Sequence, residues 1–140
     1  VKGVEGSKNA LGYFGMAYYM AHKEKLNAVN VAWDKNKATK SPVAPTKENV
    51  INGSYAALSR PLFIYVNKKS AETKPEVRKF VDFYLAHAKE LTTEVKYVPL
   101  PDAAYESVKS RFARGETGTV FGGEAAVGIK IEEILQRESK

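Results

Sequence analysis

The chain has 140 residues, 44% of them hydrophobic and 11% aromatic, and its 22 Lys plus Arg against 16 Asp plus Glu give a formal charge of +6. This composition can bury a core, which excludes a disordered or collagen-like chain. No apolar run approaches the ~18 residues of a membrane span. The absence of cysteine excludes disulfides, a thiol nucleophile and thiolate metal sites.

The first third of the chain predicts two strands with a helix between them. Residues 10–14 are a short apolar run bounded by glycine, which is typical of a buried strand. Residues 16–25 are rich in Met, Ala, Lys and Glu and predict a helix. Residues 28–33 carry Val or Trp at alternate positions and predict a second strand. Residues 35–46 contain two prolines and predict a loop.

A capped helix and a strongly β-prone segment come next. Thr46 can cap a helix over residues 47–58. Residues 62–66 read Leu-Phe-Ile-Tyr-Val, and because they are apolar throughout we expect a strand that is buried on both faces. Pro61 restricts the preceding Arg60 to extended geometry.

The C-terminal half predicts helices. Pro75 suits the first position of a helix over residues 75–88. A second helix begins near Asp102 and stops at Gly115. Residues 115–123 are a glycine-rich loop, and 129–137 predict a terminal helix. The residues expected to face inward are Val77, Phe80, Val81, Tyr84, Leu85 and Ala88 in the first of these helices, and Tyr105, Val108 and Phe112 in the second.

Strands interleaved with helices indicate an α/β fold. Three strands are few for a sheet, which suggests an incomplete domain.

Two segments are candidates for anion binding. The glycine-rich loop could cradle an oxyanion with its backbone N–H groups, but it lacks the Gly-Lys-Ser/Thr ending of a nucleotide-binding loop, so a flexible connection is the preferred interpretation. In Ser59-Arg60-Pro61, an arginine at a strand entrance can offer a bidentate fork to an oxyanion. The alternative is an arginine that bridges the ends of two elements. The sequence offers no catalytic constellation, metal cluster or cofactor motif.

Lysine and arginine are spread along the chain, with a modest cluster at Lys35, Lys37 and Lys40. This pattern is typical of a solvated surface, whereas a nucleic-acid-binding protein concentrates its basic residues on one face. A small basic nucleic-acid-binding module stays open as an alternative function.

Several motifs in order resemble one known family. Residues 3–19, the segment Ala-Ala-Leu-Ser-Arg-Pro-Leu-Phe-Ile-Tyr-Val at 56–66, the helix at 77–85 and Tyr-Val-Pro-Leu-Pro at 97–101 are similar to the phosphate-binding proteins of high-affinity phosphate ABC importers. The match runs from residue 1 to about residue 114, and the following glycine-rich stretch looks like a longer variant within that family.

The resemblance implies a two-lobed, periplasmic-binding-protein-like (type II) α/β fold that closes around a dianion by a hinge. By this analogy residues 1–58 belong to the second lobe, and 59–62 cross between the lobes. Residues 63–140 return to the first lobe and add a terminal helix. The chain is then the C-terminal part of an incomplete two-lobed architecture.

The family's main phosphate-holding motifs have no counterpart here. They are a Gly-Ser-Thr helix start, an aspartate, and an arginine followed by Ser-Gly-Thr. No phosphate ligand is therefore carried over, and only Ser59 and Arg60 remain as candidates. Because the chain opens on Val1, we expect that something upstream has been removed.

The expected function of the intact protein is to bind inorganic phosphate, without catalysis or cofactor, and to hand it to the membrane permease of an ABC importer. Its expected location is periplasmic or extracytoplasmic, and nucleic acid is not an expected partner. Exposed sheet edges of the fragment could drive homo-oligomer formation. A phosphatase-like relative on the same fold is the other alternative.

Overall fold

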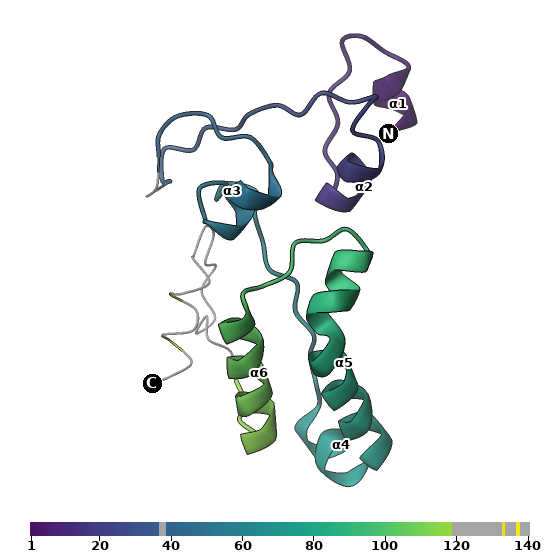
Figure 1. Cartoon of the computed structure of the whole chain (residues 1–140), viewed down its shortest axis with the longest axis vertical. Coiled ribbons are helices and arrows are strands. Elements are labelled where there is room, and N and C mark those ends of the chain that lie inside the picture. The colour runs from purple at the N-terminus through teal and green to yellow at the C-terminus, as the bar shows by residue number, and fades with distance from the viewer. Residues whose placement is uncertain (37–38, 119–132, 134–136, 138–140) are drawn as a thin grey trace.

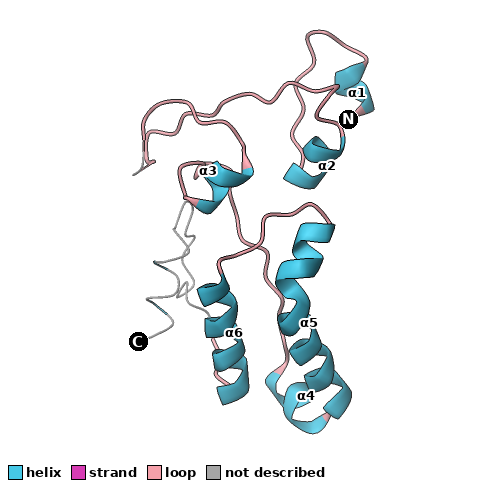
Figure 2. Cartoon of the chain, in the orientation of Figure 1, coloured by secondary structure: helices cyan, strands magenta, loops and turns pink. Residues whose placement is uncertain are grey.

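The computed structural model describes residues 1–36, 39–118, 133 and 137 (Figure 1). Within these residues the elements are helices, and β-strands are not formed; Val31 and Val43 pair in one isolated antiparallel bridge (Figure 2). None of the helices found there is long and apolar enough to cross a membrane. The helices are α1 (Lys2–Glu5), α2 (Met16–Ala21), α3 (Lys47–Ile51), α4 (Lys68–Thr73), α5 (Pro75–Glu94) and α6 (Asp102–Arg114).

The best-packed part of the chain consists of α4, α5 and α6, with α5 against both of the others (Figure 1). The buried residues of α5 are Val81, Leu85 and Ala88, which are 4–6% exposed and recur on one face of the helix. Ala104 of α6, at 2% exposure, lets the helices approach closely. The predicted helix from Pro75 is thus confirmed and is longer than expected.

The predicted inward face of α5 is confirmed for Val81, Leu85 and Ala88 and is wrong for Phe80 and Tyr84. Phe80 is 66% exposed and Tyr84 37% exposed, although both match the 3.6-residue periodicity. The reason is that α4 and α6 cover only one stripe of the α5 surface. A pattern of apolar residues identifies faces that can be buried, and the neighbouring elements decide which face is.

The start and stop of α6 are confirmed. The helix ends at Arg114, and Gly115 adopts the left-handed conformation at φ 65°. The Gly115 N–H donates to the Phe112 carbonyl at 3.0 Å, and the Glu116 N–H donates to the Arg111 carbonyl at 3.3 Å. This pair of bonds is a Schellman motif, which satisfies carbonyls at the helix end.

The three predicted strands are not formed. Residues 10–14, 28–33 and 62–66 lie outside regular structure, apart from the bridge at Val31. The expected burial of residues 62–66 is also wrong, since Leu62 is 76% and Tyr65 94% exposed. A strand requires a neighbouring strand for its backbone N–H and C=O groups, and the described residues supply none to these segments. Of the predicted α/β fold, the described residues therefore show the helices and not the sheet.

Two predicted helices are shorter than expected, and two helices are not predicted at all. α2 ends at Ala21, and α3 ends at Ile51. After α3 the polar side chain of Asn52 accepts a hydrogen bond from the Ser54 N–H at 2.9 Å, which offers the backbone an alternative to helix. Short α1 and α4 lack an apolar periodicity that would reveal them. The predicted helix over 129–137 lies almost wholly outside the described residues.

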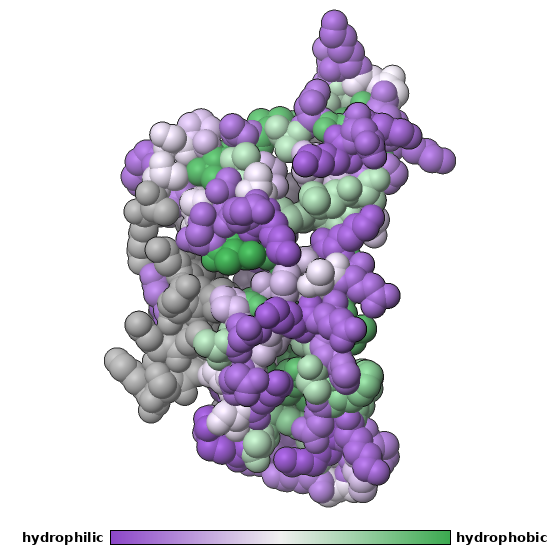
Figure 3. Space-filling model, viewed as in Figure 1, coloured by the Kyte–Doolittle hydropathy of each residue, from purple (hydrophilic) through white to green (hydrophobic). Residues whose placement is uncertain are grey.

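The described core is small. Large apolar side chains remain exposed at many positions between Leu11 and Tyr97, and Figure 3 shows apolar groups at several places on the visible face. The buried apolar residues of the described ranges are Leu26, Ala56, Ala71, Val81, Leu85, Ala88 and Ala104. Four of these seven are alanines, so little apolar area is removed from water.

Candidate functional site

Arg60 joins two segments that are 47 residues apart in sequence. Its Nη2 donates a hydrogen bond to the Tyr13 hydroxyl at 2.7 Å. Tyr13 is 67% exposed, so this contact lies at the surface. Tyr13 and Arg60 both lie outside the helices, so the arginine side chain connects two coil segments.

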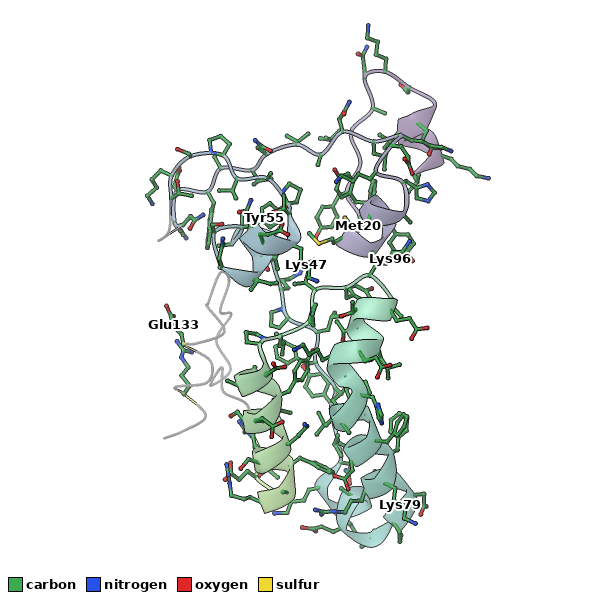
Figure 4. The ribbon with its side chains drawn as sticks, in the orientation of Figure 1. Met20, Lys47, Tyr55, Lys79, Lys96 and Glu133 are labelled. Carbon is green, nitrogen blue, oxygen red and sulfur yellow. The ribbon has the colours of Figure 1, made fainter. Side chains whose placement is uncertain are left out.

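Tyr55 belongs to the same neighbourhood. Partial burial, together with a repulsive contribution from Tyr13, raises the pKa of the Tyr55 hydroxyl. Figure 4 shows Tyr55 on the side of α3 that faces α2, where Met20 is labelled. We call Tyr13, Tyr55 and Arg60 the tyrosine–arginine cluster. Ser59 precedes Arg60 in the chain and is half-buried.

The chemistry open to this cluster is anion binding. A guanidinium carries five N–H donors in a planar fork, and one contact to Tyr13 leaves donors that can meet an oxyanion. In the ranges that the structure describes, no group of three or more His, Asp or Glu side chains could hold a metal ion. Buried side-chain N and O atoms of these ranges all have hydrogen-bond partners. The cluster thus has the donors for an anion and lacks the closed, buried geometry of a selective site.

The glycine-rich loop does not form a phosphate cradle in its described part, residues 115–118. The N–H groups of Gly115 and Glu116 are taken by the carbonyls that end α6. The Arg111 Nη2 donates to the Gly118 carbonyl at 3.1 Å, so an arginine side chain binds the loop's acceptors. Residues 119–123 lie outside the described ranges.

Of the polar network around α3, the sequence predicted only the cap. The Thr46 hydroxyl accepts from the Asn49 N–H at 3.2 Å, which confirms the predicted cap. The Asn49 Nδ2 donates to the Ala44 carbonyl at 3.0 Å. Asn36, only 5% exposed, donates from Nδ2 to the Ser54 carbonyl at 2.8 Å. Asparagines in a Pro-rich stretch signal turns in general, but no spacing rule indicates which carbonyl each one meets.

Basic residues are dispersed and pair with acidic ones on different elements. Lys89 of α5 meets the Asp102 carboxylate at 2.7 Å. Lys25 lies 3.7 Å from Glu5, a carboxylate that His22 also approaches. Lys35 and Lys40 are exposed, and Lys37 is outside the described residues. This dispersion favours the solvated-surface interpretation of the +6 charge over a nucleic-acid-binding face.

Comparison with known proteins identifies relatives over nearly the whole chain. No protein-family model matches it. The chain is 46% identical over 139 residues to protein SphX of Synechocystis, which covers 99% of this chain and 40% of the relative. It is 40% identical over 106 residues to the phosphate-binding protein PstS of Staphylococcus haemolyticus, which covers 76% of this chain and 32% of the relative.

A solved structure agrees with these relatives. The crystal structure of a possible phosphate binding protein from Planctomyces limnophilus matches with a TM-score of 0.64 and 39% sequence identity. The match covers 83% of this chain and 40% of that chain. The chain therefore spans about two fifths of the length of its SphX relatives and of this structure. It is homologous to part of protein SphX and to part of the phosphate-binding protein PstS.

Proposed function

We propose that the chain is part of an extracytoplasmic phosphate-binding protein that supplies inorganic phosphate to the membrane permease of an ABC importer. The observation that carries the proposal is the match in both sequence and fold to proteins named for phosphate binding, at 39–40% identity. In this role the protein binds and releases its ligand without catalysis. Its place of work is the periplasm or another extracytoplasmic space.

In this proposal the whole protein has the two-lobed, type II periplasmic-binding-protein fold, and the chain contributes its C-terminal part. Residues 1–58 belong to the second lobe, 59–62 cross between the lobes, and 63–140 return to the first lobe. The exposure of Leu62 and Tyr65 supports this assignment, because residues 62–66 would be a sheet strand whose neighbours come from the rest of the protein. Fragments with such edges are also prone to form homo-oligomers.

The phosphate ligands of the whole protein are expected mostly outside this chain. A selective phosphate site surrounds the anion with buried donors, since an unpaired buried polar group penalises the wrong anion. Ser59 and Arg60 are the candidates within the chain, and the bond from Arg60 to Tyr13 at 2.7 Å supports a positioning contribution at the crossover. The isolated chain is therefore expected to bind phosphate poorly.

A chimera tests the proposal. The matching segment of the Staphylococcus haemolyticus PstS protein is replaced by this chain, and phosphate binding is measured by isothermal titration calorimetry. The expected result is phosphate binding by the chimera, within about tenfold of the parent protein, because ligands held in the parent's own segment are unchanged.

The same titration on the isolated chain is the control, with no binding expected. A folded chimera without phosphate affinity would contradict the proposed function. Micromolar binding by the isolated chain would leave phosphate binding intact and would contradict its status as part of a larger site.

A further inference from the structure

The turn after α3 contains the one asparagine of the chain that is followed by glycine, Asn52 before Gly53. In such a pair the backbone nitrogen of the glycine can attack the side-chain amide carbon of the asparagine and close a succinimide ring. Glycine permits this attack because it has no side chain to block the approach. Gly53 has φ 74°, and the side chain of Asn52 is exposed, so water can reach the ring.

Ser54 directs two donors at the amide oxygen of Asn52. Its backbone N–H donates to Asn52 Oδ1 at 2.9 Å and its hydroxyl at 2.6 Å. The hydroxyl has one proton, and this contact is the shortest it makes, since two oxygens of Asn49 lie 3.3 and 3.4 Å away. Negative charge develops on Oδ1 when a nucleophile adds to the amide carbon. Donors already in place there stabilise the transition state, as in an oxyanion hole.

The position of Ser54 is itself fixed by the polar network around α3. The buried Asn36 donates from Nδ2 to the Ser54 carbonyl at 2.8 Å. On the other side of Ser54, the Tyr55 N–H donates to the Asn49 carbonyl at 2.8 Å. Donors held in place before a reaction cost no reorganisation when the charge appears. The two Ser54 donors are therefore preorganised toward the Asn52 amide.

One contact opposes the ring closure. The Gly53 N–H donates to the Val50 carbonyl at 3.2 Å, and Asn52 has ψ 0°, so the nitrogen must be released and the Asn52 backbone rotated before the attack. The helix α3 has five residues, and this bond lies beyond its last residue, where helices open most readily. Its opening does not require the bond between Asn36 and Ser54 to break.

We propose that Asn52 is a self-modification site, which the chain converts to aspartate and isoaspartate with the help of Ser54. The Gly53 nitrogen bonds to the Asn52 Cγ, the Cγ–Nδ2 bond breaks, and the proton of the nitrogen leaves with the ammonia. Water then opens the ring. Attack at Cγ gives aspartate, and attack at the backbone carbonyl carbon gives isoaspartate. The reaction uses atoms of this chain and water alone, so it goes beyond the proposed function.

The products change the end of α3. A carboxylate at position 52 adds negative charge where the last carbonyls of the helix already carry partial negative charge. Isoaspartate also lengthens the backbone between Asn52 and Gly53 by one carbon, which moves the Ser54 carbonyl relative to Asn36. We therefore expect the conversion to loosen the turn that precedes Tyr55 of the tyrosine–arginine cluster.

Incubation of the full chain in mildly alkaline heavy-oxygen water tests the proposal. Mass spectrometry of its proteolytic peptides gives the converted fraction and the uptake of heavy oxygen at each asparagine. Asn52 is expected to convert first. Asn67 is the internal control, because it is exposed and its Oδ1 accepts from the Ser70 N–H at 2.9 Å, but Lys68 follows it. Conversion of Asn52 no faster than that of Asn67 would overturn the proposal.

Two substitutions at Ser54 separate its role from that of the Asn-Gly pair. Ser54→Ala removes the hydroxyl and keeps the N–H, so conversion should be about fivefold slower, the ordinary effect of one hydrogen bond. Ser54→Thr keeps a hydroxyl and should convert within about twofold of the unchanged chain. An equal or higher rate in Ser54→Ala would overturn the help of Ser54.

A third variant keeps the test informative if the changes at Ser54 loosen the turn, as judged by faster hydrogen exchange of the Gly53 N–H. Asn52→Gln retains the amide but requires a larger ring, so heavy-oxygen uptake at this position should stop. Continued uptake in Asn52→Gln would show that water attacks the amide directly, and it would overturn the route through Gly53.

Discussion

Arg78 of α5 lies over the aromatic ring of Phe112 of α6, with its guanidinium carbon 5.4 Å from the ring centroid. This contact joins α5 and α6, the two longest helices of the described chain, where they pack against each other. Cation–π contacts at partly exposed sites contribute about 0.5–1 kcal/mol. Because α5 and α6 bury few large side chains against each other, a contact of this size is a substantial part of their association.

A double-mutant cycle measures this contact. Arg78→Met and Phe112→Leu keep apolar volume and remove the cation and the ring, and their coupling free energy is expected to be about 0.5–1 kcal/mol. Chemical denaturation followed by circular dichroism gives the four stabilities. Lys79→Met, a change at the neighbouring exposed cation, combined with Phe112→Leu is the control and should show no coupling. Equal coupling for both pairs would contradict the contact.

The end of α5 holds a residue in an unfavourable conformation. Lys96 has φ 61°, and it closes a Schellman motif in which the Tyr97 N–H donates to the Thr92 carbonyl at 3.0 Å. A non-glycine residue in this left-handed region costs roughly 1 kcal/mol relative to glycine. Lys96→Gly is therefore expected to stabilise the chain by about 0.5–1 kcal/mol.

Thermal denaturation checks this expectation. The matched control is Gly115→Ala, because Gly115 occupies the equivalent position after α6 at φ 65° and should lose about 1 kcal/mol on gaining a Cβ. Destabilisation by both substitutions would show that the strain at Lys96 is already compensated by its side chain.

The C-terminal helices could be predicted from sequence because their signals are local. Pro75 begins α5, Gly115 stops α6, and Thr46 caps α3, each through its own backbone geometry or side chain. The three predicted strands are not formed in the described residues, and the sequence could not reveal this, because strand formation depends on a partner at a distance. Residues 62–66 have the composition of a buried strand, but Leu62 to Tyr65 are exposed, and the part of the chain that the structure describes holds no strand beside them.

In the candidate site, too, a local sequence signal could be recognised and a distant contact could not. Arg60 could be identified from its place before the apolar segment, and the sequence left open whether it meets a ligand or another element. Its partner Tyr13 could not be identified, because a contact across 47 residues leaves no local pattern. The resemblance of several motifs in order agrees with the structural match to a possible phosphate binding protein at 39% identity, whereas no single residue of the candidate site pointed to that family.

A buried and an exposed apolar residue of α5 are expected to differ in the cost of truncation to alanine. Leu85 is 6% and Phe80 66% exposed, although the periodicity of the sequence places both inward. Leu85→Ala is expected to cost about 2–3 kcal/mol, because it removes buried methyl groups and leaves a cavity. Phe80→Ala, which removes the larger side chain, should cost less than about 1 kcal/mol.

Urea denaturation of both variants measures the contrast. The informative result is that Leu85→Ala costs more than Phe80→Ala. Side-chain size and hydrophobicity alone would predict the larger cost for Phe80→Ala. A larger cost for Phe80→Ala would mean that this ring is covered in solution.

The start of α3 predicts a pH-dependent local stability. The hydrogen bond of the Glu48 carboxylate to its own backbone N–H, reinforced by the Thr46 hydroxyl, lowers the pKa of Glu48 below the ordinary value of 4.5. A depressed carboxyl pKa means that the folded state favours the charged form. Its contribution is present above pH 4.5 and is lost as the pH falls through the folded-state pKa.

Thr46→Ala should therefore raise the pKa of Glu48 toward 4.5, since it removes one of the two hydrogen bonds that hold the carboxylate. A carbon-detected NMR titration of the Glu48 side chain measures the pKa in both proteins. Thr39→Ala is the control, because the Thr39 hydroxyl accepts from the Ser41 N–H, away from Glu48. An unchanged Glu48 pKa in Thr46→Ala would assign the whole shift to the helix backbone, where the positive end of the peptide dipoles favours a carboxylate.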